Sequence, residues 1–215
     1  MISKVEIGRL ALSNVGARTS IESFTENSAE ANAVNTWYDT CRKQTLEAFD
    51  WNFARKRQVL APHGDAPPEG QWEFRYQYPS DCVMARRIEN PVVPPPGLPI
   101  SANPIFMSLT GAGQDAVPFT IEISTDGTMS ILCNLDEAVL VYTFNLENTA
   151  LFSLLFVEAL ARNIGSHIAF TLTGKLEVAE KQLGAFFTLV RIAQGTNANE
   201  GIPTAPRDAE WIRGR

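Results

Sequence analysis

Apolar residues recur at every third or fourth position through the first 50 residues, which predicts two amphipathic helices. The first opens at Ser3-x-x-Glu6, where a serine hydroxyl and a glutamate three residues later satisfy free backbone donors. Gly16 is expected to end this helix. Asn27-x-x-Glu30 offers the start of the second helix.

The middle of the chain follows a two-residue period, which is typical of strands with one buried face. Aromatic and polar residues alternate after Trp72, and Thr125-Asp126-Gly127-Thr128 is a tight-turn sequence between two such runs. The pattern predicts a mostly antiparallel β region. Its strands are expected at residues 58–61, 72–78, 82–88, 119–124, 129–133 and 138–144.

A proline-rich stretch, Pro91 to Pro118, interrupts these strands with seven prolines. Because proline lacks a backbone N–H and resists regular structure, this stretch is predicted to be a long surface loop.

The last third returns to a helical period. Residues 149–172 are apolar on nearly every side, which indicates burial. Glu158 and Arg162 within them are spaced as a helical ion pair, so we expect a buried helix and not a membrane span. A second helix is predicted to start near Gly174, and a polar tail at Gly195.

Two helix pairs that flank a β region predict an α+β fold. Residues 1–54 and 146–196 are expected to form one helical bundle, because each pair has an apolar face too large to leave in water. Residues 55–145 would form an inserted antiparallel β region that contains the loop 91–118. Residues 197–215 would form an extended C-terminal tail.

The chain has 18 basic and 24 acidic residues and a net charge of −6, which gives no general attraction to nucleic-acid phosphates. The basic runs Arg55-Lys56-Arg57 and Arg86-Arg87 are short, and a solvated strand edge or ion pairs between subunits would explain them. Cys41, Cys82 and Cys133 are far apart and odd in number, so reduced thiols are expected. Charges interrupt the N-terminal apolar positions, so no secretory signal is expected.

No sequence motif of a catalytic class stands out. Gly111-x-Gly113 lacks the third glycine of a dinucleotide site. His63 lies in a proline-bounded loop, and His167 lies in a helix without a second ligand one turn away, so we expect neither a metal nor a cofactor. His167 is predicted to be a hydrogen-bonded interior or interface residue.

Three carboxylates near strand ends, Asp126, Asp136 and Glu137, require separate consideration, since glycoside hydrolysis needs only two at the right separation. Asp126 precedes a glycine in a tight turn, where aspartate is favoured for backbone reasons, and the other two also lie in a predicted turn. Turn roles are therefore the favoured interpretation. Cys82 with a distant histidine is no stronger a candidate.

Trp37, Trp51 and Trp72 could act as stacking platforms for single-stranded nucleic acid, which also requires a basic groove. The composition does not supply that groove, so core packing is the expected role of Trp37 and Trp51.

Four short motifs carry a resemblance to a known family. They are Leu46 to Arg57 (LEAFDWNFARKR), Trp72-x-x-x-Tyr76-x-x-Pro79-x-Asp81-Cys82, Ala11-Leu12-x-x-Val15-Gly16 and Trp211-Ile212-x-x-Arg215. Together they resemble the tail tubular protein A-like head-to-tail adaptors of short-tailed bacteriophages. The resemblance is best over the first 90 residues, and the proline-rich loop departs from it.

The resemblance implies a structural subunit and not an enzyme. It implies a ring, typically of twelve copies, that joins the portal protein to the tail nozzle protein and surrounds passing double-stranded DNA without sequence-specific contact. The location would be the head-to-tail junction of the virion, after synthesis in the host cytoplasm, with no membrane and no cofactor. Packing roles follow for Trp51, Phe53, Trp72, Tyr76 and Pro79.

The chain ends with Trp211, Ile212, Arg213 and Arg215. Tryptophan and arginine are enriched among residues that dominate binding energy, so we expect this tail to bind the portal or an adjacent subunit. The loop from Pro91 to Pro118 is expected to contact a neighbouring subunit or a tail protein. Two other classes remain open: a virion-associated polysaccharide hydrolase and a soluble cellular binding module.

Overall fold

The computed structural model describes residues 2–17, 19–89 and 117–199. These residues form two compact units, one within residues 1–55 and 143–200 and the other within residues 56–142. The first unit is helical and the second is built of strands, so the fold class is α+β, as the sequence predicted.

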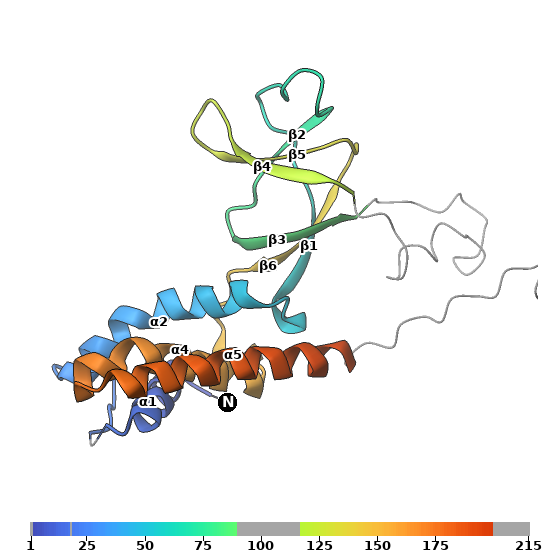
Figure 1. Ribbon diagram of the computed structural model, residues 1–215. Helices are drawn as coiled ribbons and strands as arrows, with labels where there is room; N and C mark the ends of the chain where they lie inside the picture. The colour runs from blue at the N-terminus through green and yellow to red at the C-terminus, as the bar shows by residue number, and fades with distance from the viewer. Residues whose placement is uncertain (1, 18, 90–116, 200–215) are drawn as a thin grey trace, which may run out of the picture. The chain divides into compact units, whose positions relative to one another are not determined.

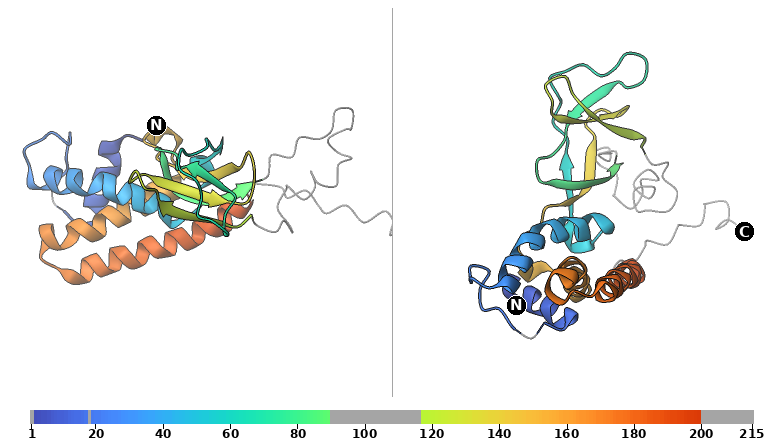
Figure 2. Two further views of the ribbon diagram at one scale, coloured as in Figure 1. Left: turned by 90° about the horizontal axis from the view of Figure 1, so that it is seen from above. Right: turned by 60° about the vertical axis from the view of Figure 1, so that its left-hand side comes forward.

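The helical unit contains four α-helices (Figure 1): α1 (Lys4–Val15), α2 (Ala29–Ala48), α4 (Leu154–Thr173) and α5 (Leu176–Asn199). The N-terminal helices α1 and α2 both pack on α4, and α4 and α5 lie side by side (Figure 2). The prediction that the two helix pairs share one bundle is therefore confirmed. Short 3-10 helices precede the strands and α4, at Asn52–Ala54 and Thr149–Leu151.

Local capping explains where the N-terminal helices begin and end. The Ser3 hydroxyl accepts a hydrogen bond from the N–H of Glu6, and the Glu6 carboxylate accepts one from the N–H of Ser3, as the capping box predicted. Gly16 ends α1 with a φ of +74°, a conformation that glycine adopts without steric cost. The predicted start of α2 at Asn27 is wrong by one residue, because the hydroxyl of Ser28 caps the N–H of Ala31.

The C-terminal helices differ from the prediction at two ends. The segment 149–172 is not one helix, since α4 begins at Leu154 after the Ser153 hydroxyl caps the N–H of Phe156. Helix α5 continues through Gly195 to Asn199, although a tail was expected from Gly195. The amide of Asn197 donates to the backbone oxygen of Asp50, and this contact offsets the roughly 1 kcal/mol that a helical glycine costs.

The second unit contains two three-stranded sheets, with strand orders β1-β6-β3 and β2-β5-β4. The strands are β1 (Arg55–Val59), β2 (Phe74–Gln77), β3 (Cys82–Glu89), β4 (Phe119–Ile123), β5 (Met129–Cys133) and β6 (Val139–Phe144). Strand β5 is antiparallel to both β2 and β4, as predicted.

Strand β1 begins three residues and ends two residues earlier than predicted, because the residues after it pair elsewhere. The N–H of Gln77 donates to the oxygen of Ala61 at 2.9 Å, and the N–H of His63 donates to the oxygen of Arg75 at 2.9 Å. Pro62 between them forms an isolated bridge with Tyr76. A proline is tolerated there because it sits at the edge of the sheet.

Candidate functional site

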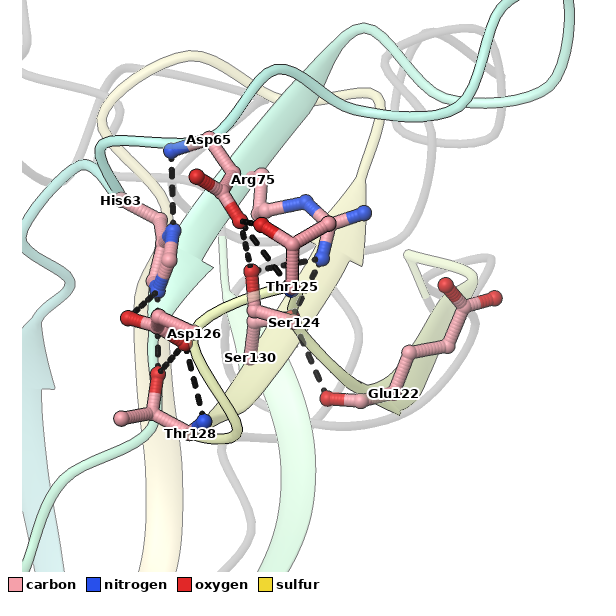
Figure 3. Close-up of polar contacts among 9 residues, drawn as sticks. All are labelled: His63, Asp65, Arg75, Glu122, Ser124, Thr125, Asp126, Thr128 and Ser130. Atoms are coloured by element: carbon pink, nitrogen blue, oxygen red, sulfur yellow. Dashed lines mark hydrogen bonds and ion pairs between the residues drawn. The ribbon is translucent and has the colours of Figure 1, made fainter.

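A hydrogen-bonded polar cluster holds the turn between β4 and β5 against the loop before β2 (Figure 3). One carboxylate oxygen of Asp65 accepts hydrogen bonds from the hydroxyls of Ser124 and Thr125 and from the N–H of Thr125, the last at 3.1 Å. The hydroxyl donors, with the backbone donor, lower the pKa of Asp65 to about 2. This charged carboxylate is therefore an acceptor that fixes the turn.

His63 in the same cluster has only 7% of its side chain exposed. Its Nδ1 lies 3.0 Å from the N–H of Asp65 and can only accept that bond, so the neutral ring carries its proton on Nε2. That Nε2 donates to the hydroxyl oxygen of Thr128 at 3.1 Å, and the Thr128 hydroxyl donates to Asp126 at 2.7 Å. With a proton on Nε2, the ring donates toward Thr128 and also lies 3.5 Å from Asp126, and these contacts hold the turn in place.

Arg75 completes the cluster from β2. Its Nη1 donates to the hydroxyl oxygens of Ser130 at 3.0 Å and Ser124 at 3.3 Å. Ser130 is fully buried, and its hydroxyl also donates to the backbone oxygen of Glu122 at 3.2 Å. The contacts of Arg75 thus join β2 to β5 and to the turn that follows β4.

Sequence analysis identified the turn of this cluster but missed its outside partners. The bonds of Asp126 to Thr128 follow from the Asp-Gly turn sequence. Asp65 and Arg75 lie 59 and 49 positions from Ser124 in the sequence. Patterns within a short stretch of sequence cannot predict hydrogen bonds over such separations. In the described ranges, no group of three or more histidine, cysteine, aspartate or glutamate residues could hold a metal ion.

The three carboxylates considered for glycoside hydrolysis do not come together. Asp126 lies in the turn before β5, and Asp136 and Glu137 lie in the turn after it. A strand of this length separates its two ends by about 15 Å, whereas a hydrolytic pair needs roughly 5–10 Å. Asp126 hydrogen-bonds its own turn, and Glu137 has a left-handed φ of 52°, so both are turn residues as predicted.

The three cysteines are free thiols, as expected. Burial raises the pKa of Cys41 to about 12 and that of Cys82 to about 11, and it also raises the pKa of Cys133. The nucleophilic thiolate form is therefore scarce at neutral pH for each of them.

The basic run at the start of β1 is paired with carboxylates. Arg55 contacts Asp50 at 2.8 Å, and Lys56 contacts Asp81 at 2.7 Å. Arg57 contacts Glu89 at 3.1 Å. These ion pairs lie within one chain, whereas the expected ion pairs were between subunits, and they neutralise charge that a phosphate-binding groove would need.

Two aromatic residues of the family motif, Trp51 and Phe53, pack within the helical unit. Trp51 is buried, and its indole N–H donates to the oxygen of Thr45 at 2.8 Å. Phe53 and Trp51 both contact Phe156 edge to face. In the β unit, Tyr76 and Pro79 are buried and Trp72 is half-buried.

Trp37 and His167 form a stacked pair with ring centroids 4.3 Å apart. Both side chains are half-buried, so Trp37 packs at the margin of the core and not at its centre. Among the described residues, the His167 ring has this stack in place of the predicted hydrogen bond. Burial lowers the pKa of His167.

The outward side of α5 carries an apolar stripe. Gln182, Phe186, Val190 and Ala193 form the buried side of this helix. Leu176, Leu183 and Phe187 lie on one flank at spacings of seven and four residues and are 60%, 43% and 57% exposed. We call these three residues the outer stripe.

The expected partner-binding residues Trp211, Ile212, Arg213 and Arg215 lie outside the described residues, as does the loop expected from Pro91 to Pro118 up to residue 116. No helix among the described residues is long and apolar enough to cross a membrane. Comparison of the chain with protein-family models and with curated proteins finds no match.

Proposed function

We propose that this chain is a structural adaptor that forms a ring between a phage portal and the tail nozzle and surrounds the exiting DNA. The observation that carries the proposal is the outer stripe of α5. A helix that buries one side on its neighbours and exposes leucine and phenylalanine beside it has surface suited to a further protein contact. The resemblance of the motifs around Trp51 and Tyr76 to head-to-tail adaptors specifies that contact as a neighbouring copy.

The charge of the chain supports the same proposal. A ring of subunits that each carry −6 repels the phosphates of passing DNA, so the genome would slide without adhering to the wall. A ring also needs two different contact surfaces on every subunit, because the contacts are head-to-tail. The outer stripe supplies one of them.

Mass photometry and electron microscopy of the purified chain, alone and mixed with portal protein, test the proposal. We expect rings, with twelve copies as the family resemblance implies. The double variant Leu183→Glu/Phe187→Glu should abolish rings while its thermal unfolding stays close to that of the natural chain, since both side chains are exposed. Thr188→Glu, on the same helix but outside the stripe, is the control and should assemble normally.

Two results would count against the adaptor. The first is a chain that stays monomeric beside portal, which favours a binding module. The second is a stripe variant that assembles as well as the Thr188→Glu control.

A further inference from the structure

The sheet β2-β5-β4 has one edge covered and one edge open among the described residues. Residues 61–63 pair with the outer side of β2 through the bonds of Ala61 to Gln77 and of His63 to Arg75. Strand β4 pairs with β5 alone, and no other described strand or bridge lies against it.

The register shows which backbone groups face the open edge. The N–H of Ser124 donates to the oxygen of Thr128 at 2.8 Å, and the oxygen of Glu122 accepts from the Ser130 side chain on β5. Because hydrogen-bonded pairs alternate in an antiparallel ladder, Glu122 and Thr120 bond toward β5. The N–H and C=O groups of Phe119, Ile121 and Ile123 therefore point away from the sheet.

Two of the three exposed side chains on this edge are isoleucines, although edge strands usually carry charge. Ile121 is 39% exposed and Ile123 is 75% exposed. Strand β1, an edge of the other sheet, carries Arg55, Lys56 and Arg57 instead, and such charges discourage the addition of another strand. Strand β4 has neither lysine, arginine nor proline, so its edge is open to strand addition.

One acid stands between the two isoleucines. The Glu122 side chain is exposed and points away from the polar cluster in Figure 3, and no ion pair among the described residues involves it. The cluster of Asp65 and Arg75 already holds the β4–β5 hairpin in place. The binding of an added strand would therefore lose little conformational entropy in β4. The edge thus fits an extended segment that is apolar and basic.

The C-terminal end of this chain has that composition. Helix α5 ends at Asn199, and the last prolines are Pro203 and Pro206, so every residue from 207 onward has a backbone donor. In the register that sets Arg213 opposite Glu122, Ile212 lies opposite an isoleucine. Residues 200–211 can span up to about 40 Å, enough to leave one copy and reach another.

We propose that the β4 edge of one copy accepts residues 211–215 of a second copy as an added strand. The inference rests on the proposed function and deepens it. Donor segment and acceptor edge are different surfaces of the same chain, so the contact is head-to-tail and can close a ring.

Binding of a labelled peptide of residues 205–215 to a chain truncated after Ile202, followed by fluorescence anisotropy, tests the acceptor edge. Ile121→Pro removes an outward N–H and leaves the bonds to β5, and Ile123→Lys adds charge without changing the backbone. Each should weaken peptide binding by about tenfold or more. Val59→Lys, an exposed position on the β1 edge, is the matched control and should bind like the truncated chain. Equal binding by Ile121→Pro, Ile123→Lys and Val59→Lys overturns the proposal.

A mixing experiment tests transfer between copies. The truncated chain keeps the edge and lacks the segment, whereas full-length Ile121→Pro keeps the segment and lacks the edge. With Leu183→Glu/Phe187→Glu in both chains to remove the outer-stripe contact, neither chain should self-associate, and their mixture should form a one-to-one complex by mass photometry. Absence of that complex overturns the proposal, as does self-association of the truncated chain through two β4 edges.

Ring formation separates this inference from the proposed function. If the truncated chain forms rings as readily as the full chain, strand addition is overturned and the adaptor stands. If the peptide binds and the mixture forms its complex, yet no rings form with or without portal, strand addition is supported and the adaptor is overturned.

Discussion

The guanidinium Nη1 of Arg42 donates a hydrogen bond of 2.8 Å to the backbone oxygen of Leu146, which lies 104 positions away. The same nitrogen lies 2.7 Å from Oδ1 of Asn145. Only 1% of the Arg42 side chain is exposed, with Asp39 at 3.5 Å and Glu147 at 3.7 Å as its carboxylate partners. One buried cation thus joins α2 to the segment that leads into α4.

Arg42→Ala is expected to destabilise the helical unit by about 2–4 kcal/mol, because the buried oxygen of Leu146 loses its donor and the side-chain packing is lost. Arg42→Lys should recover part of this loss, since one ammonium cannot reproduce the planar fork. Urea unfolding followed by circular dichroism measures the change. Lys43→Ala, at the exposed neighbouring position, is the control, and a loss equal to that of Arg42→Ala would contradict the assignment.

Arg42 also shows which features of the structure could not be predicted from the sequence. The helices, their caps and the β4–β5 turn follow from residues within four positions of one another, and these were predicted closely. Arg42 lies on a helix whose apolar period is clear, but its partners Asn145 and Leu146 are far away in sequence. A charged residue on an amphipathic helix is usually solvated, so burial of this one depends on tertiary contacts alone.

The same limit applies to the polar cluster and to the end of α5. Asp65 sits in a loop of ordinary polar composition, and its role appears only when Ser124 and Thr125 are brought beside it. Gly195 favours a helix end by local rules, but the contact of Asn197 with Asp50 extends the helix past it. Long-range hydrogen bonds overrode local preference in both places.

Asp65→Asn should lower the free energy of unfolding of the β unit at neutral pH. It should also remove the part of the pH dependence of that free energy that comes from the Asp65 carboxylate. The pKa of Asp65 is lowered from 3.8 to about 2, so its contribution is complete above pH 4 and is lost as the pH falls toward 2. Thermal unfolding of the natural chain and the variant from pH 7 to pH 2 should therefore converge at the acid end. Glu69→Gln, in the same loop, should show no such convergence.

Trp51→Ala is expected to cost about 3–5 kcal/mol, because the indole fills the space between Phe49, Phe53 and Phe156. Trp51→Phe keeps much of that packing but leaves the oxygen of Thr45 without its donor, at a cost of about 1–3 kcal/mol. Urea unfolding measures both. Trp37→Phe, at the half-buried stack, should cost less than Trp51→Phe, and the reverse order would show that Trp51 is not the centre of this core.

Burial of His167, whose ring stacks on Trp37, is expected to make the helical unit sensitive to mild acid. Burial lowers the pKa of His167 below its ordinary value of 6.5, so the folded unit prefers the neutral ring. The stability that depends on the neutral ring is complete above pH 6.5, and it declines as the pH falls, since the unfolded chain then binds the proton more readily.

His167→Phe keeps an aromatic ring on Trp37 and removes the titration, so the variant should gain stability relative to the natural chain between pH 7 and pH 5. His63→Gln leaves His167 as the single histidine, and its ring resonances can then be titrated directly by nuclear magnetic resonance. A midpoint at or above 6.5, or parallel stability curves for the natural chain and His167→Phe, would show that the stack does not keep this histidine neutral.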